Sequence, residues 1–358
     1  MKKLPVALWS LAVPAAACII LAGAWNRPLG AAALALVAAA LVAAVFAAVH
    51  HAEVVAHRVG EPFGTLVLAL AVTVIEVALV VSMMLSGGPE ASELARDTVF
   101  ATVMIVCNGV VGLCLVAGAL RHRELEFRVE GTGPALAVLI ALTALTLVLP
   151  SYTLTTPGPS YSPAQLVFAG AMSLILWSVF VLAQTGRYRE YFLPTGAAHE
   201  EQAAPPSGAA TLASVVLLVF SLVAVIGLAK ILSPSIRTLV EAASAPPAVV
   251  GIAIALIVLL PETVAAIRAA ARNRMQTSLN LALGSALATI GLTIPAVAVV
   301  AIVADLPLAL GLPPKEAVLA LVTFVIASIT LATGRASVMQ GAVHLTVFAA
   351  FLFLAVIP

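Results

Sequence analysis

Long apolar runs constrain this chain more than any other feature of its sequence. About eleven runs of roughly 20 residues follow one another, separated by short polar gaps, and a helix of about 20 apolar residues can cross the hydrocarbon core of a bilayer. Backbone groups in lipid must be hydrogen-bonded, and the runs are too long for barrel strands. The sequence therefore predicts an all-α polytopic membrane protein with about 11 transmembrane helices. These are expected near residues 4–25, 29–50, 61–86, 97–120, 134–152, 161–184, 210–232, 246–270, 276–304, 314–333 and 338–357.

The composition supports this class and excludes others. Hydrophobic residues make up 63% of the chain and charged residues 9%, whereas soluble domains carry about 25% charged residues. A net charge of +1 and the lack of a basic run exclude nucleic acid as a partner. The three cysteines lie in apolar runs without disulfide or metal spacing, and no cofactor is expected. Met1-Lys2-Lys3 resembles the start of a secretory signal, but the following run continues to Trp25 and is long enough to span.

The distribution of basic residues predicts the orientation of the chain. If the N-terminus is cytoplasmic, 12 of the 17 Lys and Arg residues fall in cytoplasmic gaps and 5 in gaps on the other side. Cytoplasmic loops of membrane proteins carry an excess of Lys and Arg. With an odd number of spans, the sequence therefore predicts a cytoplasmic N-terminus and an external C-terminus. The five residues expected outside are Arg27, Arg96, Lys230, Arg237 and Lys315.

Glu76 and Glu262 are the only acidic residues that lie deep inside apolar runs, because every other Asp or Glu falls in a polar gap or at its edge. A carboxylate at the bilayer midplane costs several kcal/mol unless it is paired, protonated or bound to a cation. The plain alternative is a protonated carboxyl that hydrogen-bonds a neighbouring helix. Since such residues are rare without a function, the pair predicts a site that binds cations or protons.

The two glutamates lie on opposite sides of the longest polar gap, which runs from Thr185 to Ser207 near the middle of the chain. The gap contains Pro205-Pro206 and has the composition of a linker. In the predicted topology the helix carrying Glu76 begins in the cytoplasm and the helix carrying Glu262 begins outside. This pattern is typical of an inverted repeat, in which the substrate binds near the midplane where the halves meet.

Several neighbours of the glutamates could supply further oxygen ligands. Thr73 lies three residues before Glu76, on the same helix face. Pro261 precedes Glu262 and cannot donate to the carbonyl of Ile257, which predicts a freed carbonyl and a kink. Asn108 and Ser285 fall at matching places on the helices that follow, although close helix packing is an equally good explanation for either one.

The ligand count leaves the ion open. Calcium takes about six to eight oxygens, and two carboxylates supply at most four. Thr73, Asn108, Ser285, backbone carbonyls and water could complete such a shell, whereas a smaller coordination number would suit sodium. Because desolvation favours protonation of a carboxyl and a bound cation opposes it, cation and proton would compete at Glu76 and Glu262.

Four histidines are weaker candidates. His50, His51 and His57 cluster at the predicted cytoplasmic end of the second helix, where they could sense cytosolic pH. Plain interfacial histidines explain the same positions. For His344, inside the last helix, we expect a hydrogen bond to a neighbouring helix.

Four blocks of the sequence form a recognisable pattern: Gly60-Glu61-Pro62-Phe63-Gly64-Thr65, Val72-Thr73-Val74-Ile75-Glu76, Pro261-Glu262 and residues 273–295. On these blocks the chain resembles the calcium/cation antiporter superfamily, and within it the ChaA-like bacterial calcium/proton antiporters. The resemblance covers most of the sequence. The chain departs from the vacuolar-type cation/proton exchangers, which carry Gly-Asn before each glutamate and His after the second. This chain instead has Val72-Thr73, Val258-Leu259 and Thr263 at those places.

This resemblance implies two inverted five-helix repeats after an extra N-terminal helix. The corresponding boundaries are residues 1–28 for the N-terminal helix, 29–184 for the first repeat, 185–209 for a cytoplasmic linker and 210–358 for the second repeat. It also implies alternating access, with Glu76 and Glu262 as the repeat glutamates and Asn108 and Ser285 at the polar positions that follow. ChaA-like members are associated with calcium, sodium and potassium.

The sequence therefore predicts a multi-pass protein of the bacterial inner membrane that exports Ca²⁺, or Na⁺ or K⁺, in exchange for protons, and that is not an enzyme. Its partners would be these ions and membrane lipid, and a homo-oligomer is left open. Two alternatives remain. A cation channel would use the same glutamates without obligatory countertransport. An intramembrane serine hydrolase would use Ser285 activated by His344, but it leaves both glutamates unexplained.

Overall fold

The computed structural model describes residues 8–60, 63–87, 91–193, 206–242, 246 and 248–357. Most of these residues are helical, which confirms the all-α prediction. Within them, ten helices are long and apolar enough to cross a membrane, and a shorter apolar helix of 17 residues precedes them. Every predicted span therefore corresponds to a helix. Glu61, Pro62, Pro247 and most of the predicted linker, residues 194–205, lie outside the described residues.

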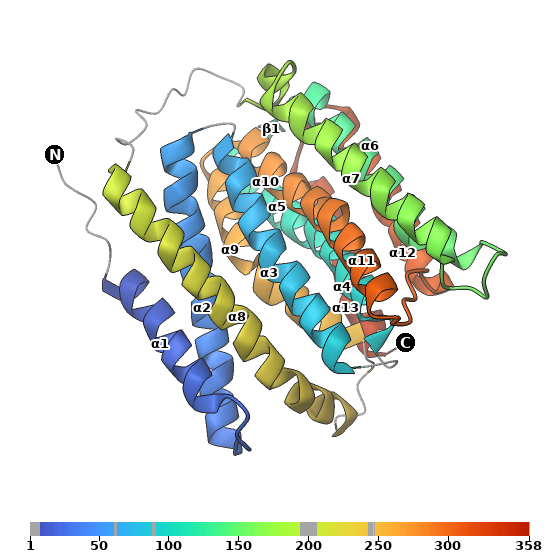
Figure 1. The fold of residues 1–358 in the computed structure, drawn as a ribbon. Helices are drawn as coiled ribbons and strands as arrows, with labels where there is room; N and C mark the ends of the chain where they lie inside the picture. The colour runs from blue at the N-terminus through green and yellow to red at the C-terminus, as the bar shows by residue number, and fades with distance from the viewer. Residues whose placement is uncertain are drawn as a thin grey trace. The chain divides into compact units, whose positions relative to one another are not determined.

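The chain divides into two compact units, each of which draws helices from both sides of the central linker. In the first unit, α1 packs against α2 and α8, and α3 packs against the same two helices (Figure 1). The division into repeats at 29–184 and 210–358 is a different division of the chain and stays a prediction. The first unit consists of α1 (Leu8–Ala24), α2 (Ala31–Val59), α3 (Phe63–Gly87) and α8 (Gly208–Ala242).

The second unit is built around two broken helices. α4 (Leu94–Met104) continues through a π-helical segment (Ile105–Val110) into α5 (Val111–His122), and α10 (Met275–Ala288) continues through another (Thr289–Thr293) into α11 (Ile294–Val303). Such wider turns often occur at functional sites. The other elements are α6 (Val129–Thr143), a π-helical segment (Ala144–Val148), 3₁₀ turns (Leu149–Ser151 and Arg189–Phe192), α7 (Pro163–Thr185), α9 (Ala248–Ala271), α12 (Pro314–Ala332) and α13 (Val338–Val356).

A two-residue antiparallel ladder joins the loop after α5 to the segment between the last two helices. β1 (Leu125–Glu126) pairs with β2 (Arg335–Ala336), with Leu125 opposite Ala336. Gly334 precedes β2 with φ of 67°, a left-handed conformation that favours glycine. The ladder and this turn separate α12 from α13 although the polar gap between them is short.

Several helices extend beyond the predicted spans. The span expected at 29–50 continues to Val59, and the one expected at 210–232 continues through Pro234 to Ala242. The helix expected to begin at 134 begins at Val129. Hydropathy marks the part of a helix that suits lipid, whereas backbone hydrogen bonding continues through the polar residues beyond it.

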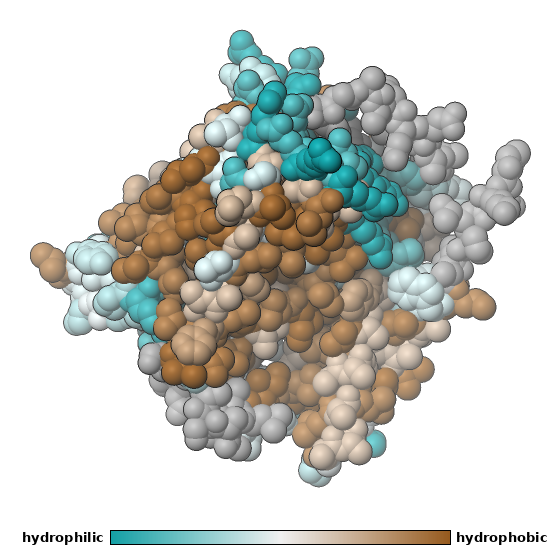
Figure 2. Space-filling model, turned by 180° about the vertical axis from the view of Figure 1, so that it is seen from behind, coloured by the Kyte–Doolittle hydropathy of each residue, from teal (hydrophilic) through white to brown (hydrophobic). Residues whose placement is uncertain are grey.

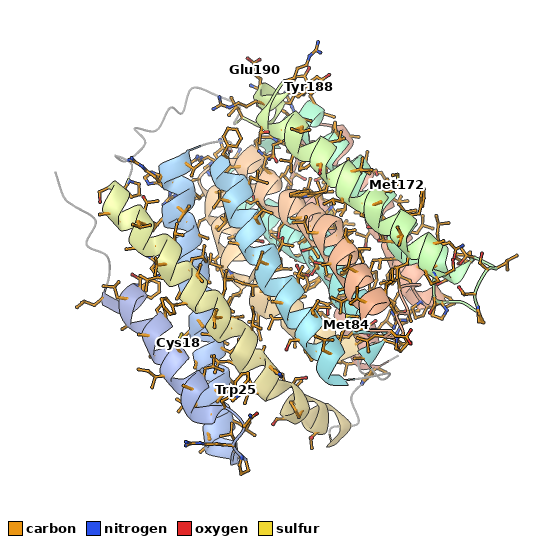
Figure 3. All side chains as sticks on the ribbon, viewed as in Figure 1. Cys18, Trp25, Met84, Met172, Tyr188 and Glu190 are labelled. Carbon is orange, nitrogen blue, oxygen red and sulfur yellow. The ribbon has the colours of Figure 1, made fainter. Side chains whose placement is uncertain are left out.

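The first residues of the predicted linker are docked onto the second unit. After α7, where Tyr188 and Glu190 lie (Figure 3), the 3₁₀ turn at Arg189–Phe192 accepts two hydrogen bonds through its carbonyls. Arg128 Nη1 donates to the Glu190 carbonyl at 3.0 Å, and Asn280 Nδ2 donates to the Phe192 carbonyl at 2.6 Å. The turn is thereby tied to both α6 and α10.

The outer surface suits a lipid environment. The face drawn in Figure 2 is mostly apolar, with hydrophilic side chains gathered near its rim. In the second unit, α7 illustrates the pattern, because large apolar side chains are exposed along much of its length. These are Val167, Phe168, Leu174, Ile175, Val179 and Leu182.

Candidate functional site

The structure places Glu262 and Ser285 in direct contact. Glu262 lies on α9 and is 8% exposed, and the Ser285 hydroxyl on α10 donates a hydrogen bond to Glu262 Oε2. The adjacent Thr263 hydroxyl donates to the Leu259 carbonyl at 2.8 Å and so turns back to its own helix. α9 is continuous through Pro261, which cannot donate to the carbonyl four residues earlier. A buried carboxylate and a hydroxyl oxygen are thus held together.

Glu76 and Thr73 form a second buried pair on α3, in the other compact unit. Their exposed fractions are 2% and 3%. The Thr73 hydroxyl donates to the Ala69 carbonyl at 2.8 Å. Because the hydroxyl proton is used in this bond, the lone pairs of its oxygen point elsewhere and can accept or coordinate. Thr73 therefore has the geometry of an oxygen ligand rather than of a donor.

Asn108 belongs to a different network from Ser285. It is fully buried in the π-helical segment Ile105–Val110, and its Nδ2 donates to Thr323 Oγ1 on α12 at 2.8 Å. Its Oδ1 lies 3.3 Å from His344 Nδ1 on α13. Its described hydrogen bonds thus run to α4, α12 and α13, and not to Glu262 or Ser285.

The polar partners of Asn108 were only partly predictable. His344 makes the expected hydrogen bonds to neighbours, since its Nε2 also lies 3.1 Å from Thr330 Oγ1. Thr323 and Thr330 were missed by the sequence reasoning, although they are seven residues apart and share one face of a helix. That spacing indicates a polar helix face that could contact another helix. However, threonines whose hydroxyls bond a carbonyl of their own helix can show the same spacing.

The three N-terminal histidines differ in exposure and contacts. His51 is buried, His50 is half-buried with its ring centroid 4.9 Å from that of Trp9, and His57 is exposed. The rings of His50 and His51 contact each other edge to face, with centroids 5.5 Å apart. The hypothesis that they sense pH stays a prediction.

His51 contacts a carbonyl that cannot receive the usual helical hydrogen bond, because a proline stands four residues later. The Ser10 carbonyl on α1 would normally accept from residue 14, but Pro14 has no N–H. His51 Nε2 lies 2.8 Å from that carbonyl, which can only accept, so Nε2 carries the proton. Nδ1 then accepts from the Ser214 hydroxyl on α8, at 3.3 Å. One side chain thereby ties α1 and α8 to α2.

His51→Leu is expected to lower the free energy of unfolding by about 1–3 kcal/mol, because the buried hydrogen bonds of His51 to the Ser10 carbonyl and the Ser214 hydroxyl are lost. Thermal unfolding in detergent measures the loss. The variant Pro14→Ala/His51→Leu should recover part of it, since residue 14 then supplies an N–H. A role in pH sensing predicts in addition a shifted pH dependence of activity. Equal stability of His51→Leu and the parent chain would contradict the structural role.

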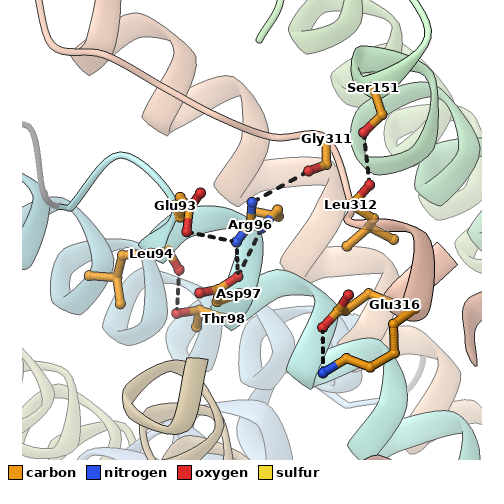
Figure 4. Close-up of polar contacts among 10 residues, drawn as sticks. Glu93, Leu94, Arg96, Asp97, Thr98, Ser151, Gly311, Leu312 and Glu316 are labelled. Carbon is orange, nitrogen blue, oxygen red and sulfur yellow. Dashed lines mark hydrogen bonds and ion pairs between the residues drawn. The ribbon is translucent and has the colours of Figure 1, made fainter. Parts of the chain in front are cut away.

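A cluster of charged residues lines a cavity of about 190 Å³ in the second unit (Figure 4). Arg96 binds Asp97 Oδ1 at 2.8 Å and Glu93 Oε2 at 3.1 Å, and Lys315 lies 3.3 Å from Glu316 Oε1. Asp97 lies at the edge of a predicted polar gap, yet its side chain is only 12% exposed. The second unit therefore encloses another carboxylate, which is neutralised by Arg96.

The geometry gives no support to the hydrolase alternative. Ser285 donates to Glu262, and the described polar contacts of His344 are with Asn108, Thr330 and the Cys107 backbone, so the serine is not paired with a histidine base. Among the described residues, no group of three or more His, Cys, Asp or Glu side chains could hold a metal ion. The candidate cation ligands are therefore single buried carboxylates with hydroxyl or amide groups on the same or the following helix.

A helical polytopic fold with buried carboxylates defines a membrane transporter. The sequence profile described as sodium/calcium exchanger protein matches residues 29–186 and 213–357. The chain therefore belongs to this family, within the calcium/cation antiporter superfamily, and it is a cation antiporter rather than an enzyme.

Two curated relatives support this assignment, and one solved structure shares the fold. The chain is 48% identical to y4hA of Sinorhizobium fredii over 360 residues, covering 99% of this chain and 97% of that one. It is 35% identical over 321 residues to the sodium-potassium/proton antiporter ChaA of Escherichia coli, covering 87% and 85%. The crystal structure of the H⁺/Ca²⁺ exchanger CAX has the same fold, with a TM-score of 0.71 and 17% identity over 97% of this chain and 87% of that chain.

Proposed function

We propose that the chain exports Ca²⁺ in exchange for protons across a bacterial inner membrane, with Na⁺ and K⁺ as further substrates to be tested. The observation that carries the proposal is the buried Glu262 carboxylate held by the Ser285 hydroxyl. The names of the relatives support both choices of ion, since one is a sodium-potassium/proton antiporter and another an H⁺/Ca²⁺ exchanger.

In this proposal Glu76 and Glu262 bind either protons or a cation. Burial favours the neutral carboxyl, whereas a bound cation favours the carboxylate. Each glutamate therefore releases its proton as the cation binds, and this competition couples the two fluxes. Thr73, Asn108 and Ser285 supply the neutral oxygens, and water completes the shell. In the inverted-repeat arrangement each repeat contributes one glutamate, and the bound ion is exposed to the two sides of the membrane in turn.

The direction of transport follows from the driving force. The proposal keeps a cytoplasmic N-terminus and an external C-terminus. Because the proton gradient across a bacterial inner membrane is directed inward, proton entry drives cation export. Moving one charge across the potential is worth about 2.3 kcal/mol per 100 mV. Exchange of two protons for one Ca²⁺ is electroneutral and responds only to the pH gradient, whereas any other ratio responds to voltage.

Exchange in proteoliposomes under an imposed pH gradient tests the function directly. Ca²⁺, Na⁺, K⁺ and Mg²⁺ are supplied separately while lumenal pH is followed with a dye. We expect Ca²⁺ to dissipate the gradient, and Mg²⁺ to have little effect because it gives up its water shell reluctantly. A cation channel would instead show cation flux that persists without a proton gradient or proton movement. That result would refute antiport.

Ser285→Ala is expected to raise the cation concentration for half-maximal exchange about tenfold, because a hydrogen bond to a charged group is worth about 1.5–3 kcal/mol and 1.4 kcal/mol is a factor of ten. The maximal rate should fall less. Ser285→Thr keeps a hydroxyl and is the matched control. An unchanged half-maximal concentration in the alanine variant would remove Ser285 from the site.

A further inference from the structure

His344 is held on both sides by hydrogen bonds in the interior of the second unit. Its side chain, on α13, is fully buried. Nδ1 lies 3.3 Å from Asn108 Oδ1, and Nε2 lies 3.1 Å from Thr330 Oγ1. The imidazole also hydrogen-bonds the backbone of Cys107, the residue before Asn108. It thereby connects the π-helical segment that carries Asn108 to α12.

The donors and acceptors of this network fix the orientation of the Asn108 amide. Its Nδ2 donates to Thr323 Oγ1 at 2.8 Å and faces Met104 Sδ at 3.9 Å, which uses both amide hydrogens. Thr323 donates onward to Met104 Sδ at 3.4 Å. The oxygen Oδ1 therefore faces His344, and since an amide oxygen only accepts, the histidine proton lies on Nδ1. Nε2 then accepts from the Thr330 hydroxyl.

Close helix packing allows the short imidazole to reach Asn108. A Cβ atom built on Gly112 of α5 would lie 2.9 Å from Leu345 Cγ and 3.1 Å from His344 Cβ. A Cβ on Gly341 of α13 would lie 2.8 Å from Val116 Cγ2. Small residues at these two places bring the backbones of α5 and α13 together. The wider turn of the π-helical segment carries Asn108 at the level of this contact.

We propose that His344 is a positioning residue that holds the Asn108 amide with its oxygen available to the transported cation. The inference rests on the proposed role of Asn108 as a neutral ligand. A carbonyl oxygen has two lone pairs, and the bond from Nδ1 occupies one of them. Without that bond the amide can rotate by half a turn and present its NH₂ group, which repels a cation. Partners of this kind orient a ligand and affect cation affinity about 10–100-fold.

Two substitutions test the two ring nitrogens of His344 one at a time. His344→Asn places an amide nitrogen near the position of Nδ1 and keeps a donor for Asn108. His344→Gln places its amide near the position of Nε2 and keeps only the contact with Thr330. In proteoliposomes, with Ca²⁺, Na⁺ and K⁺ each tested, we expect His344→Gln to raise the half-maximal cation concentration at least about tenfold. His344→Asn should stay close to the parent chain, and maximal rates should change little in both.

The readouts distinguish positioning from packing. If His344 only fills space, the two variants lose stability and affinity together, and their thermal unfolding in detergent follows their transport. Such parallel losses would overturn the inference. In an Asn108→Ala background, His344→Gln should have no further effect on the half-maximal concentration, because the group that it positions is gone.

The same series separates failure of this inference from failure of the proposed function. If Asn108→Ala raises the half-maximal concentration and His344→Gln does not, the inference is wrong while Asn108 remains a ligand. If Asn108→Ala has no effect, Asn108 is not a ligand and both statements about it are wrong. Absence of exchange by the parent chain with any of the three cations would refute the antiport on which both depend.

Discussion

Glu262→Gln is expected to abolish cation-dependent proton release in inverted membrane vesicles, and Glu76→Gln is expected to do the same. Glutamine keeps the shape of the side chain but cannot bind and release a proton, and it offers a cation no net charge. Both glutamates are almost fully buried, where a cation without a compensating carboxylate is costly. Proton release is followed with a pH-sensitive dye after addition of Ca²⁺, Na⁺ or K⁺.

Glu130→Gln provides a matched control for this experiment. Glu130 lies in the first turn of α6 and is exposed, so its charge is solvated and its loss should leave exchange unchanged. Equal amounts of monodisperse protein for all variants exclude a folding defect as the cause. Wild-type exchange by either Glu76→Gln or Glu262→Gln would rule out the site with two carboxylates.

The pairing of Glu262 with Ser285 follows from sequence because it depends on a local hairpin. α9 ends at Ala271 and α10 begins at Met275, with Asn273 in a left-handed conformation between them. Glu262 lies nine residues before the end of α9, and Ser285 lies ten residues after the start of α10. In an antiparallel helix pair these positions are level, which follows from the rise of about 1.5 Å per residue.

The network of Asn108 could not be predicted in the same way. Its partners Thr323 and His344 are 215 and 236 residues away in sequence, and no local pattern states which helices become neighbours. The same limit applies to His51, since Pro14 indicates that a carbonyl on α1 is free but not which helix supplies the donor. Hydropathy located the helices for a simpler reason, which is that each span must suit lipid by itself.

The hydropathy pattern also gives no sign that the ion pair of Arg96 with Asp97 is buried. Arg96 is 5% exposed, and its guanidinium contacts Asp97 through both Nε and Nη2 at 2.8 Å. Nη1 donates to the Gly311 carbonyl at 3.4 Å. Glu93 is half exposed, so its contact with Arg96 contributes less. The charge of Asp97 is thus compensated mainly by a single neighbour.

Arg96→Ala is therefore expected to destabilise the protein by about 3–5 kcal/mol, the cost of leaving one partner of a buried ion pair without compensation. Unfolding by heat or SDS in detergent micelles measures the change. The double variant Arg96→Ala/Asp97→Ala removes both charges and should regain most of the stability, whereas Glu93→Gln should change it by less than about 1 kcal/mol. If the double variant is as unstable as Arg96→Ala, the loss comes from packing around the arginine stem rather than from the uncompensated carboxylate.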